Sequence, residues 1–149
     1  MCYAVPMRIR QLNHSVYQLQ YHVVWGTKYR RKILKSYVRV ELIKSLYKTL
    51  KHHPDWYISN INTGIDHVHM LIEIPPKYSV AAVVKEIKSE TSRELRKRFK
   101  FIDKIYRHSG VWSVGYFVSS VGLNEKQIKR YIDNQNRYDV GVDVSAEYS

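Results

Sequence analysis

Two histidines stand two positions apart in the segment DHVHMLIE, a spacing that could serve metal binding. Side chains alternate between the two faces of a β-strand, so His67 and His69 would point the same way. Val68 and Met70 would then lie on the opposite, apolar face. Two imidazoles on one face can bind a single metal ion, but hydrogen-bonded or solvated histidines show the same spacing. The histidine pair alone therefore does not define a metal site.

A second pair of candidate residues, Tyr131 and Gln135, lies near the end of the chain. Residues four apart share one face of a helix, and Ile128 and Ile132 fall on that same face, which is expected to point inward. Either residue alone would be interpreted as structural. In combination with the paired histidines and a basic chain, they supply a nucleophile and a third metal ligand.

The charge of the chain favours a polyanionic partner. Its 149 residues carry 25 Lys and Arg against 13 Asp and Glu, a net charge of +12. Much of the excess lies in two clusters, residues 28–32 and 93–100, and such clusters favour nucleic acid over a merely solvated surface. A membrane surface is less favoured, because the basic segments lack a wide apolar face. Tyr29, within the first cluster, could stack on an unpaired base, although tyrosines also fill cores.

The length and composition predict one domain, 1–149, in the cytoplasm. No apolar run reaches the ~18–20 residues that span a bilayer, and the N-terminal residues do not resemble a signal peptide. Cys2 is the only cysteine, which excludes a disulfide framework and a cysteine-rich zinc site.

Hydrophobic periodicity predicts the order βαββαβ followed by one further helix. This order is typical of an α+β, ferredoxin-like (RRM-like) antiparallel sheet with its helices on one face. Residues 139–149 are expected to fray, and Ser79 is the expected N-cap of the second helix. Strands are expected at 15–27, 56–62, 65–74 and 111–119, and helices at about 36–52, 80–99 and 125–138.

Four segments together resemble the HUH single-tyrosine transposases of the IS200/IS605 insertion-sequence family: KYRRKIL, HVHMLIEIPP, WSVGYFVSSVG and NEKQIKRYIDNQ. The similarity runs from about Val16 to Tyr138. It implies that Tyr131 is the nucleophile, and that Mg²⁺ or Mn²⁺ is bound by His67, His69 and Gln135. Tyr138 does not fit the spacing of the two-tyrosine HUH enzymes, so a single nucleophile is expected.

The resemblance further implies cleavage and rejoining of single-stranded DNA through a 5′-phosphotyrosine. The resemblance also implies a homodimer, in which the tyrosine helix of one subunit completes the histidine site of the other. It further implies recognition of DNA hairpins near the element ends. The two basic clusters are the candidates for DNA binding, and no membrane partner is expected. The candidate DNA-binding residues are Lys28, Arg30, Arg31, Lys32, Arg93, Arg96, Lys97 and Arg98.

Three other functions are compatible with the same features. A βαββαβ sheet can bind single-stranded RNA without catalysis, by stacking bases on aromatic side chains. An HUH nickase would use the same chemistry without rejoining two element ends. A repeat-associated relative of these transposases would act as a monomer.

Overall fold

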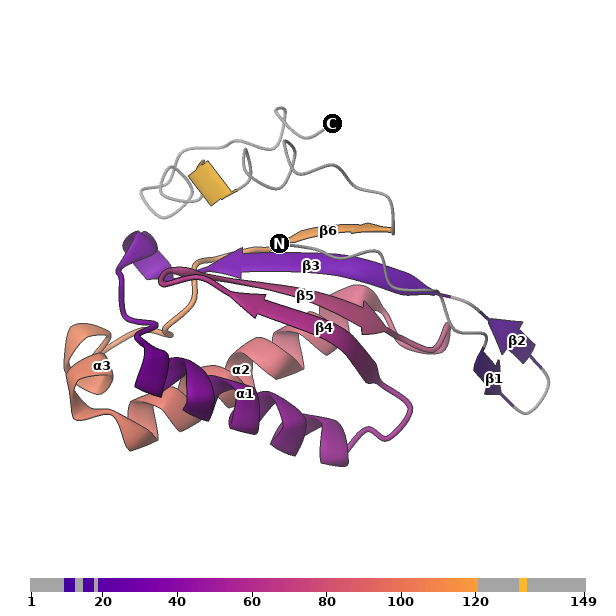
Figure 1. Cartoon of the computed structure of the whole chain (residues 1–149), viewed down its shortest axis with the longest axis horizontal. Helices are drawn as coiled ribbons and strands as arrows, with labels where there is room; N and C mark the ends of the chain where they lie inside the picture. The colour runs from indigo at the N-terminus through magenta and orange to yellow at the C-terminus, as the bar shows by residue number, and fades with distance from the viewer. Residues whose placement is uncertain (1–9, 13–14, 18, 121–131, 134–149) are drawn as a thin grey trace.

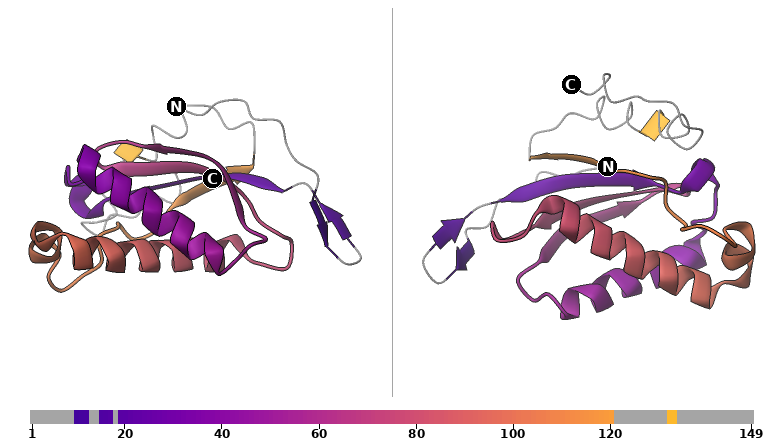
Figure 2. Two further views of the ribbon diagram at one scale, coloured as in Figure 1. Left: turned by 60° about the horizontal axis from the view of Figure 1, so that its bottom comes forward. Right: turned by 180° about the vertical axis from the view of Figure 1, so that it is seen from behind.

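A four-stranded antiparallel sheet and two long helices form the body of the protein (Figure 1). The structure is a computed structural model that describes residues 10–12, 15–17, 19–120 and 132–133. The strands lie in the order β4-β5-β3-β6. Both long helices cover the same face of the sheet, as the two further views show (Figure 2). These elements are β3 (Gln20–Gly26), α1 (Ser36–Lys51), β4 (Tyr57–Thr63), β5 (His67–Glu73), α2 (Val80–Arg98) and β6 (Phe117–Ser120).

This arrangement confirms the predicted ferredoxin-like α+β fold. The chain runs β3-α1-β4-β5-α2-β6, and the two central strands, β5 and β3, pair with each other along their whole length. Of the predicted C-terminal helix, only Ile132 and Asp133 are described, and they are helical. The rest of 125–138 and the tail 139–149 lie outside the described residues. Within the described part of the chain, no helix combines the length and apolar character needed to cross a membrane.

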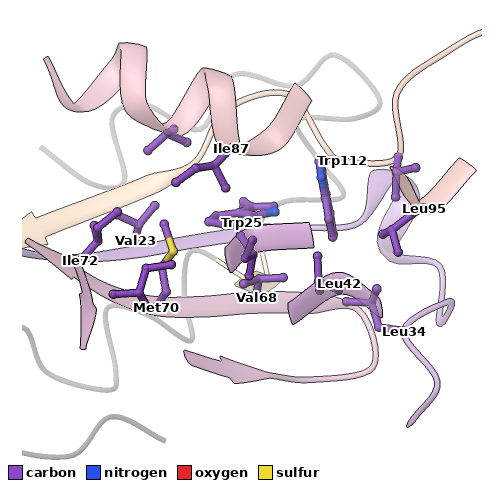
Figure 3. Packing of buried hydrophobic residues seen from close by; sticks show 14 of the residues in the cluster. Val23, Trp25, Leu34, Leu42, Val68, Met70, Ile72, Ile87, Leu95 and Trp112 are labelled. Atoms are coloured by element: carbon purple, nitrogen blue, oxygen red, sulfur yellow. The ribbon is translucent and has the colours of Figure 1, made fainter. Parts of the chain in front are cut away.

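The hydrophobic core lies between the sheet and the two helices (Figure 3). On β5, Val68, Met70 and Ile72 alternate with the histidine-bearing positions and are almost completely buried. The expected apolar face of this strand is therefore the one that packs against the helices. Other fully buried members of this core are Val23 and Trp25 from β3, Leu42 and Leu46 from α1, and Val84, Ile87 and Leu95 from α2.

The prediction of one continuous strand at 15–27 was wrong. Its first part, β2 (Ser15–Tyr17), pairs with β1 (Arg10–Leu12) in a separate two-stranded sheet, and β3 begins only at Gln20. Both parts are rich in residues with high β propensity, so composition does not reveal the break between them.

The strand predicted at 111–119 was too long at its start, because the strand assigned as β6 begins at Phe117. Trp112 makes only an isolated bridge to Thr27. Gly115 adopts a left-handed φ of 84°, which does not fit a regular strand. Nearby, Lys88 Nζ donates to the carbonyls of Ser113 and Gly115, at 2.8 and 2.7 Å, and fixes this irregular segment.

Two short helical elements were not predicted. The 3-10 helix η1 (Lys28–Arg30) follows β3, and α3 (Lys100–Ile105) follows α2. Each is too short for its hydrophobic period to be recognised in the sequence. The N-cap prediction for α2 was right, because Ser79 Oγ accepts a hydrogen bond from the backbone N–H of Ala82 at 3.1 Å.

Candidate active site

The two histidines lie on the sheet face opposite the helices, at the end where β3 leads into η1. In the β3–β5 register, His67 is opposite Gly26 and His69 is opposite Val24. His69 is 8% exposed, and the side chain of His67 is 30% exposed. Leu71, on the same face, is also buried. The histidines are therefore not simply solvated on an open sheet surface.

His67 is oriented by a carboxylate. Its Nδ1 lies 2.9 Å from Oδ1 of Asp66, and the other carboxylate oxygen accepts hydrogen bonds from Nε and Nη2 of Arg30, at 3.1 and 2.8 Å. Burial alone would raise the pKa of Asp66, but the hydrogen bonds from His67 and Arg30 hold it below its usual value. An ionised carboxylate at Nδ1 favours the tautomer protonated there. The lone pair is then on Nε2, where a metal ion could bind.

A glycine makes room for the His67 ring. A Cβ atom on Gly64 would lie 2.3 Å from Cε1 and 2.7 Å from Nδ1 of His67, far inside normal contact. The N–H of Gly64 donates to the His67 carbonyl at 2.9 Å, in the turn from β4 to β5. Gly64 therefore both forms the turn between the two strands and leaves space for the histidine ring.

His69 is held by a third histidine that sequence reasoning missed. Its Nε2 lies 3.1 Å from Nδ1 of His22 on β3. Burial lowers the pKa of His69 to about 4, and the neighbouring His22 and His67 add to this effect. Burial also lowers the pKa of His22. His69 is therefore neutral near pH 7, which is the protonation state that a metal ligand requires.

The described residues include two of the three predicted metal ligands. They contain no group of three or more His, Cys, Asp or Glu side chains placed to hold an ion. His67 and His69 share one face of the sheet, whereas the predicted third ligand, Gln135, lies outside the described residues. So do Tyr131 and Tyr138. The metal-binding role of the two histidines and the parts played by Gln135, Tyr131 and Tyr138 stay predictions.

One described contact brings the segment after Tyr131 close to the histidines. Nη1 of Arg30 donates to the carbonyl of Ile132, while the same guanidinium binds Asp66. Ile132 directly follows Tyr131 in the sequence. Arg30 thus contacts both the residue that orients His67 and the chain next to the predicted nucleophile.

The first basic cluster divides into inward and outward side chains. Tyr29 and Arg30 both have left-handed backbones, with φ of 60° and 52°. This turn directs Arg30 inward, where its side chain is only 17% exposed. Tyr29, Arg31 and Lys32 are exposed, and Lys28 is half-buried. Nζ of Lys28 and the guanidinium carbon of Arg31 each lie 5.8 Å from the Tyr29 ring centroid.

In the second basic cluster, several arginines have partners within the protein. Arg96 binds Asp103 and the carbonyls of Arg107 and Ser109. Arg93 pairs with Glu90, and Arg98 with Glu41. Lys97 and Lys100 are exposed.

The second cluster borders an open cavity. The cavity has a volume of about 820 Å³, and its lining includes Arg93, Arg96, Lys97, Lys100 and Trp112. Trp112 bridges to Thr27, and the N–H of Lys28 donates to the Val111 carbonyl at 2.8 Å. The start of the first cluster is therefore bonded to the segment that borders this cavity, although residues 28–32 do not line it.

Comparison with known proteins places the chain among transposases. Residues 15–135 match the IS200-like transposase family. The transposase for insertion sequence element IS200 from Salmonella typhimurium is 33% identical over 140 residues, which cover 93% of this chain and 91% of that protein. The ISDra2 transposase TnpA from Deinococcus radiodurans is 25% identical over 133 residues, covering 89% and 94%.

Two solved structures have the same fold. One, a candidate transposase from Deinococcus radiodurans, superposes with a TM-score of 0.75 at 26% identity and covers 85% of this chain and 97% of that one. The other is a REP-associated tyrosine transposase bound to a REP hairpin, with a TM-score of 0.53 at 14% identity, covering 95% and 74%.

The fold and these relatives define the class of protein as a transposase, an enzyme that cleaves and transfers DNA strands. The chain belongs to the IS200-like family of transposases.

Proposed function

We propose that this transposase cleaves and rejoins single-stranded DNA at insertion-sequence ends through a 5′-phosphotyrosine on Tyr131. His67, His69 and Gln135 would hold Mg²⁺ or Mn²⁺. The observation that carries the proposal is the placement of the two imidazoles on one sheet face, where His67 is bonded to Asp66 and His69 is buried. Asp66 directs the lone pair of His67 to Nε2, and burial keeps His69 neutral.

A divalent ion, when bound, would supply a Lewis acid that polarises a non-bridging oxygen of the scissile phosphate. His67 would bind through Nε2, the nitrogen that Asp66 leaves unprotonated. His69 has its Nε2 bonded to His22, so it would exchange that hydrogen bond for the ion or bind through Nδ1. An amide oxygen suits Mn²⁺ and Mg²⁺, and of these two ions the imidazole nitrogens favour Mn²⁺ in affinity.

In the proposed reaction, Tyr131 Oη attacks the phosphorus and forms the new P–O bond. The bond from phosphorus to the 3′ oxygen breaks, and that oxygen takes a proton and leaves as a free 3′-OH. Because one phosphoester replaces another, attack by a 3′-OH on the phosphotyrosine can rejoin two ends without ATP. The phenol has an ordinary pKa of ~10, so its proton must pass to an acceptor as the bond forms.

Single-stranded DNA with hairpins is the proposed partner. A protein of the same fold is known bound to a REP hairpin. In this chain, Arg31, Lys32, Lys97 and Lys100 are exposed cations that could neutralise backbone phosphates. Of the other predicted DNA-binding residues, Lys28, Arg93, Arg96 and Arg98 stay candidates.

A homodimer with shared sites is proposed because one tyrosine per chain makes one covalent link, whereas excision handles two element ends. Here Arg30 binds the Ile132 carbonyl of its own chain. An assembly in which the tyrosine segment serves the other subunit would have to break this contact. The contact therefore distinguishes a site built within one chain from one shared between two.

The covalent intermediate gives the most direct test. The protein is incubated with labelled single strands that carry its own flanking DNA, with Mn²⁺ or with EDTA, and adducts are separated under denaturing conditions. We expect an adduct only with Mn²⁺, lost in Tyr131→Phe and kept in Tyr138→Phe. An adduct that forms equally well with Tyr131→Phe would contradict the assignment of the nucleophile. Binding of single strands with no adduct would instead favour a non-catalytic binding module.

A heterodimer tests the shared site. If the tyrosine of one subunit completes the histidine site of the other, mixing Tyr131→Phe with His67→Ala creates one intact site. The two chains carry different tags, and we expect the labelled DNA on the His67→Ala chain. A verified, DNA-binding heterodimer with adduct on neither chain would show that each site is built within one subunit.

A further inference from the structure

The guanidinium of Arg30 binds two groups: the carboxylate of Asp66, which orients His67, and the backbone carbonyl of Ile132, which follows Tyr131 in the sequence. Nε and Nη2 donate to Asp66 at 3.1 and 2.8 Å, and Nη1 donates to the carbonyl of Ile132. The side chains of Arg30 and Asp66 are 17% and 15% exposed. All three guanidinium nitrogens of the arginine therefore have a partner inside the protein.

The backbone around Arg30 is built to aim its side chain inward. Tyr29 and Arg30 occupy the left-handed region, with φ of 60° and 52°, which costs conformational energy for a residue with a Cβ. Such a conformation persists only where surrounding contacts fix it. Here the Arg30 N–H donates to the Thr27 carbonyl and the Thr27 N–H to the Asp66 carbonyl, each at 2.9 Å. Tyr106 Oη donates to the Lys28 carbonyl at 2.8 Å.

We infer that Arg30 is a positioning residue, which orients His67 through its bond to Asp66. The inference rests on the proposed function for the role of His67 in the reaction, whereas the orientation of the ring follows from the described contacts. It differs from the prediction from sequence that Arg30 contacts DNA phosphates. The contact of Arg30 with the Ile132 carbonyl belongs to the arrangement within one chain and would be broken in a site shared between two subunits.

The chemistry of arginine suits this double contact. The guanidinium is a rigid planar fork with five donors, so it can bind a carboxylate through two nitrogens while the third reaches a carbonyl. A lysine has a compact ammonium and cannot hold both groups in the same planar geometry. Arg30 also places its positive charge against partly buried Asp66, the partner of His67, with Nη2 at 2.8 Å from the carboxylate.

The state of the His67 ring can be measured without DNA or metal. In ¹⁵N-labelled protein, long-range spectra report which ring nitrogen carries the proton, and a His67→Gln variant assigns the signals. We expect the wild type to show the Nδ1-protonated form, and Arg30→Lys and Asp66→Ala to show a mixture of tautomers. Arg39→Lys is the matched control, because Arg39 donates to the Thr63 carbonyl at 3.2 Å in the same hairpin and does not contact Asp66. An unchanged His67 spectrum in Asp66→Ala would overturn the inference.

Metal affinity gives a second readout. Replacing residues that orient a metal ligand typically weakens binding 10–100-fold, so we expect a loss of about that size in Mn²⁺ affinity for Asp66→Ala, measured by titration calorimetry. Arg30→Lys should lose less, and the double variant should lose no more than Asp66→Ala, because Arg30 acts through Asp66. Additive losses of Mn²⁺ affinity in the double variant would overturn the inference that Arg30 acts through Asp66. Asp66→Asn, which keeps the side-chain shape, replaces Asp66→Ala if the latter does not fold.

Salt dependence separates positioning from DNA contact. A residue that neutralises one phosphate contributes about 0.7 to the slope of log affinity against log salt for single strands. We expect Arg30→Lys and Arg30→Gln to bind labelled single-stranded DNA with the wild-type slope, while the adduct forms more slowly. A slope reduced by about 0.7 in Arg30→Gln, with Mn²⁺ affinity and the His67 tautomer unchanged, would establish Arg30 as a phosphate contact and overturn the inference.

The inference and the proposed function can fail separately. A wild-type protein that never forms an adduct on Tyr131 contradicts the proposed function. The tautomer and Mn²⁺ measurements would still decide whether Arg30 orients His67. Conversely, a normal adduct rate in Arg30→Gln, from protein whose unfolding midpoint matches the wild type, would overturn the inference and leave the proposed function intact.

Discussion

Both faces of β5 are largely buried, but burial has a different effect on each face. On the inner face, Val68, Met70 and Ile72 pack against the helices, and their contribution is non-directional. On the outer face, His67 and His69 are held by hydrogen bonds to Asp66 and His22 at 2.9 and 3.1 Å. Burial stabilises the fold on one side, and on the other it keeps an imidazole neutral.

Substitutions on the inner face of β5 should therefore damage stability, and those on the outer face should damage chemistry. A seven-residue strand places both kinds of side chain one position apart, because consecutive residues point to opposite faces. Substitutions on the inner face should shift unfolding with little effect on the folded site. Substitutions on the outer face should do the reverse.

The largest effect is expected for His69→Ala, on the outer face. Loss of a metal ligand removes stabilisation of charge in the transition state, for which a single group is worth about 10²–10³ in rate. We expect adduct formation in single-turnover assays to fall by at least this factor. The free energy of unfolding should change by no more than about 1–2 kcal/mol, the cost of one buried hydrogen bond.

His52→Ala is the control for this variant, because it removes an exposed histidine at the C-cap of α1. It should cleave at the wild-type rate. Undiminished cleavage by His69→Ala with Mn²⁺ would show that the outer face of β5 does not carry the chemistry.

The next effect is expected on the inner face, for Ile72→Ala. Ile72 is fully buried in the core, and removing such a side chain costs about 2–5 kcal/mol of unfolding free energy. Urea unfolding should show a loss in this range. Mn²⁺ affinity measured well below the new midpoint should stay within about twofold of the wild type, since the substitution removes no hydrogen bond of the histidines. A large loss of metal affinity in fully folded Ile72→Ala would show that the two faces are coupled.

The inner face and the paired histidines could be predicted because both follow from alternation along one strand. His22 could not, because its contact with His69 depends on the register between β3 and β5, which are 47 residues apart at this point. Spacing within one segment carries no information on such a register.

The inward orientation of Arg30 was not predicted, for a related reason. The cluster 28–32 suggests a uniformly exposed basic loop, whereas two left-handed residues turn one of its cations inward. The broken first strand and the late start of β6 likewise depend on tertiary contacts, such as those of Lys88 with Ser113 and Gly115. The composition of these segments favours strands throughout.

A smaller effect on stability is expected from a change of pH, because it alters the protonation of His69 on the outer face. In the metal-free protein, the folded pKa of His69 is about 4, against an unfolded value of 6.5. Between these values the unfolded chain binds more protons, so stability falls as pH is lowered from about 6.5 to 4 and is constant above about 7. His22, whose pKa burial also lowers, acts in the same direction.

The size of this effect is about 1–3 kcal/mol, because each pKa unit corresponds to 1.36 kcal/mol. Urea unfolding in EDTA at pH 5 and pH 7.5 measures it. His69→Gln removes the titrating group and should show a smaller loss between the two pH values. An equal loss in this variant would assign the pH dependence to other groups.

The smallest effect is expected for Gly64→Ala, which alters the outer face without replacing a histidine or its carboxylate. The added Cβ would lie 2.3 Å from Cε1 of His67, and the ring cannot easily yield because Asp66 holds its Nδ1. We expect the ring to shift and Mn²⁺ affinity to fall by about tenfold, the lower end of the range for a disturbed metal ligand. Gly110→Ala is the matched control, since its Cβ would meet only Ser92 Oγ at 3.6 Å. If Gly64→Ala kept the wild-type Mn²⁺ affinity and His67 spectrum, the close fit of ring and glycine would not be what positions this histidine.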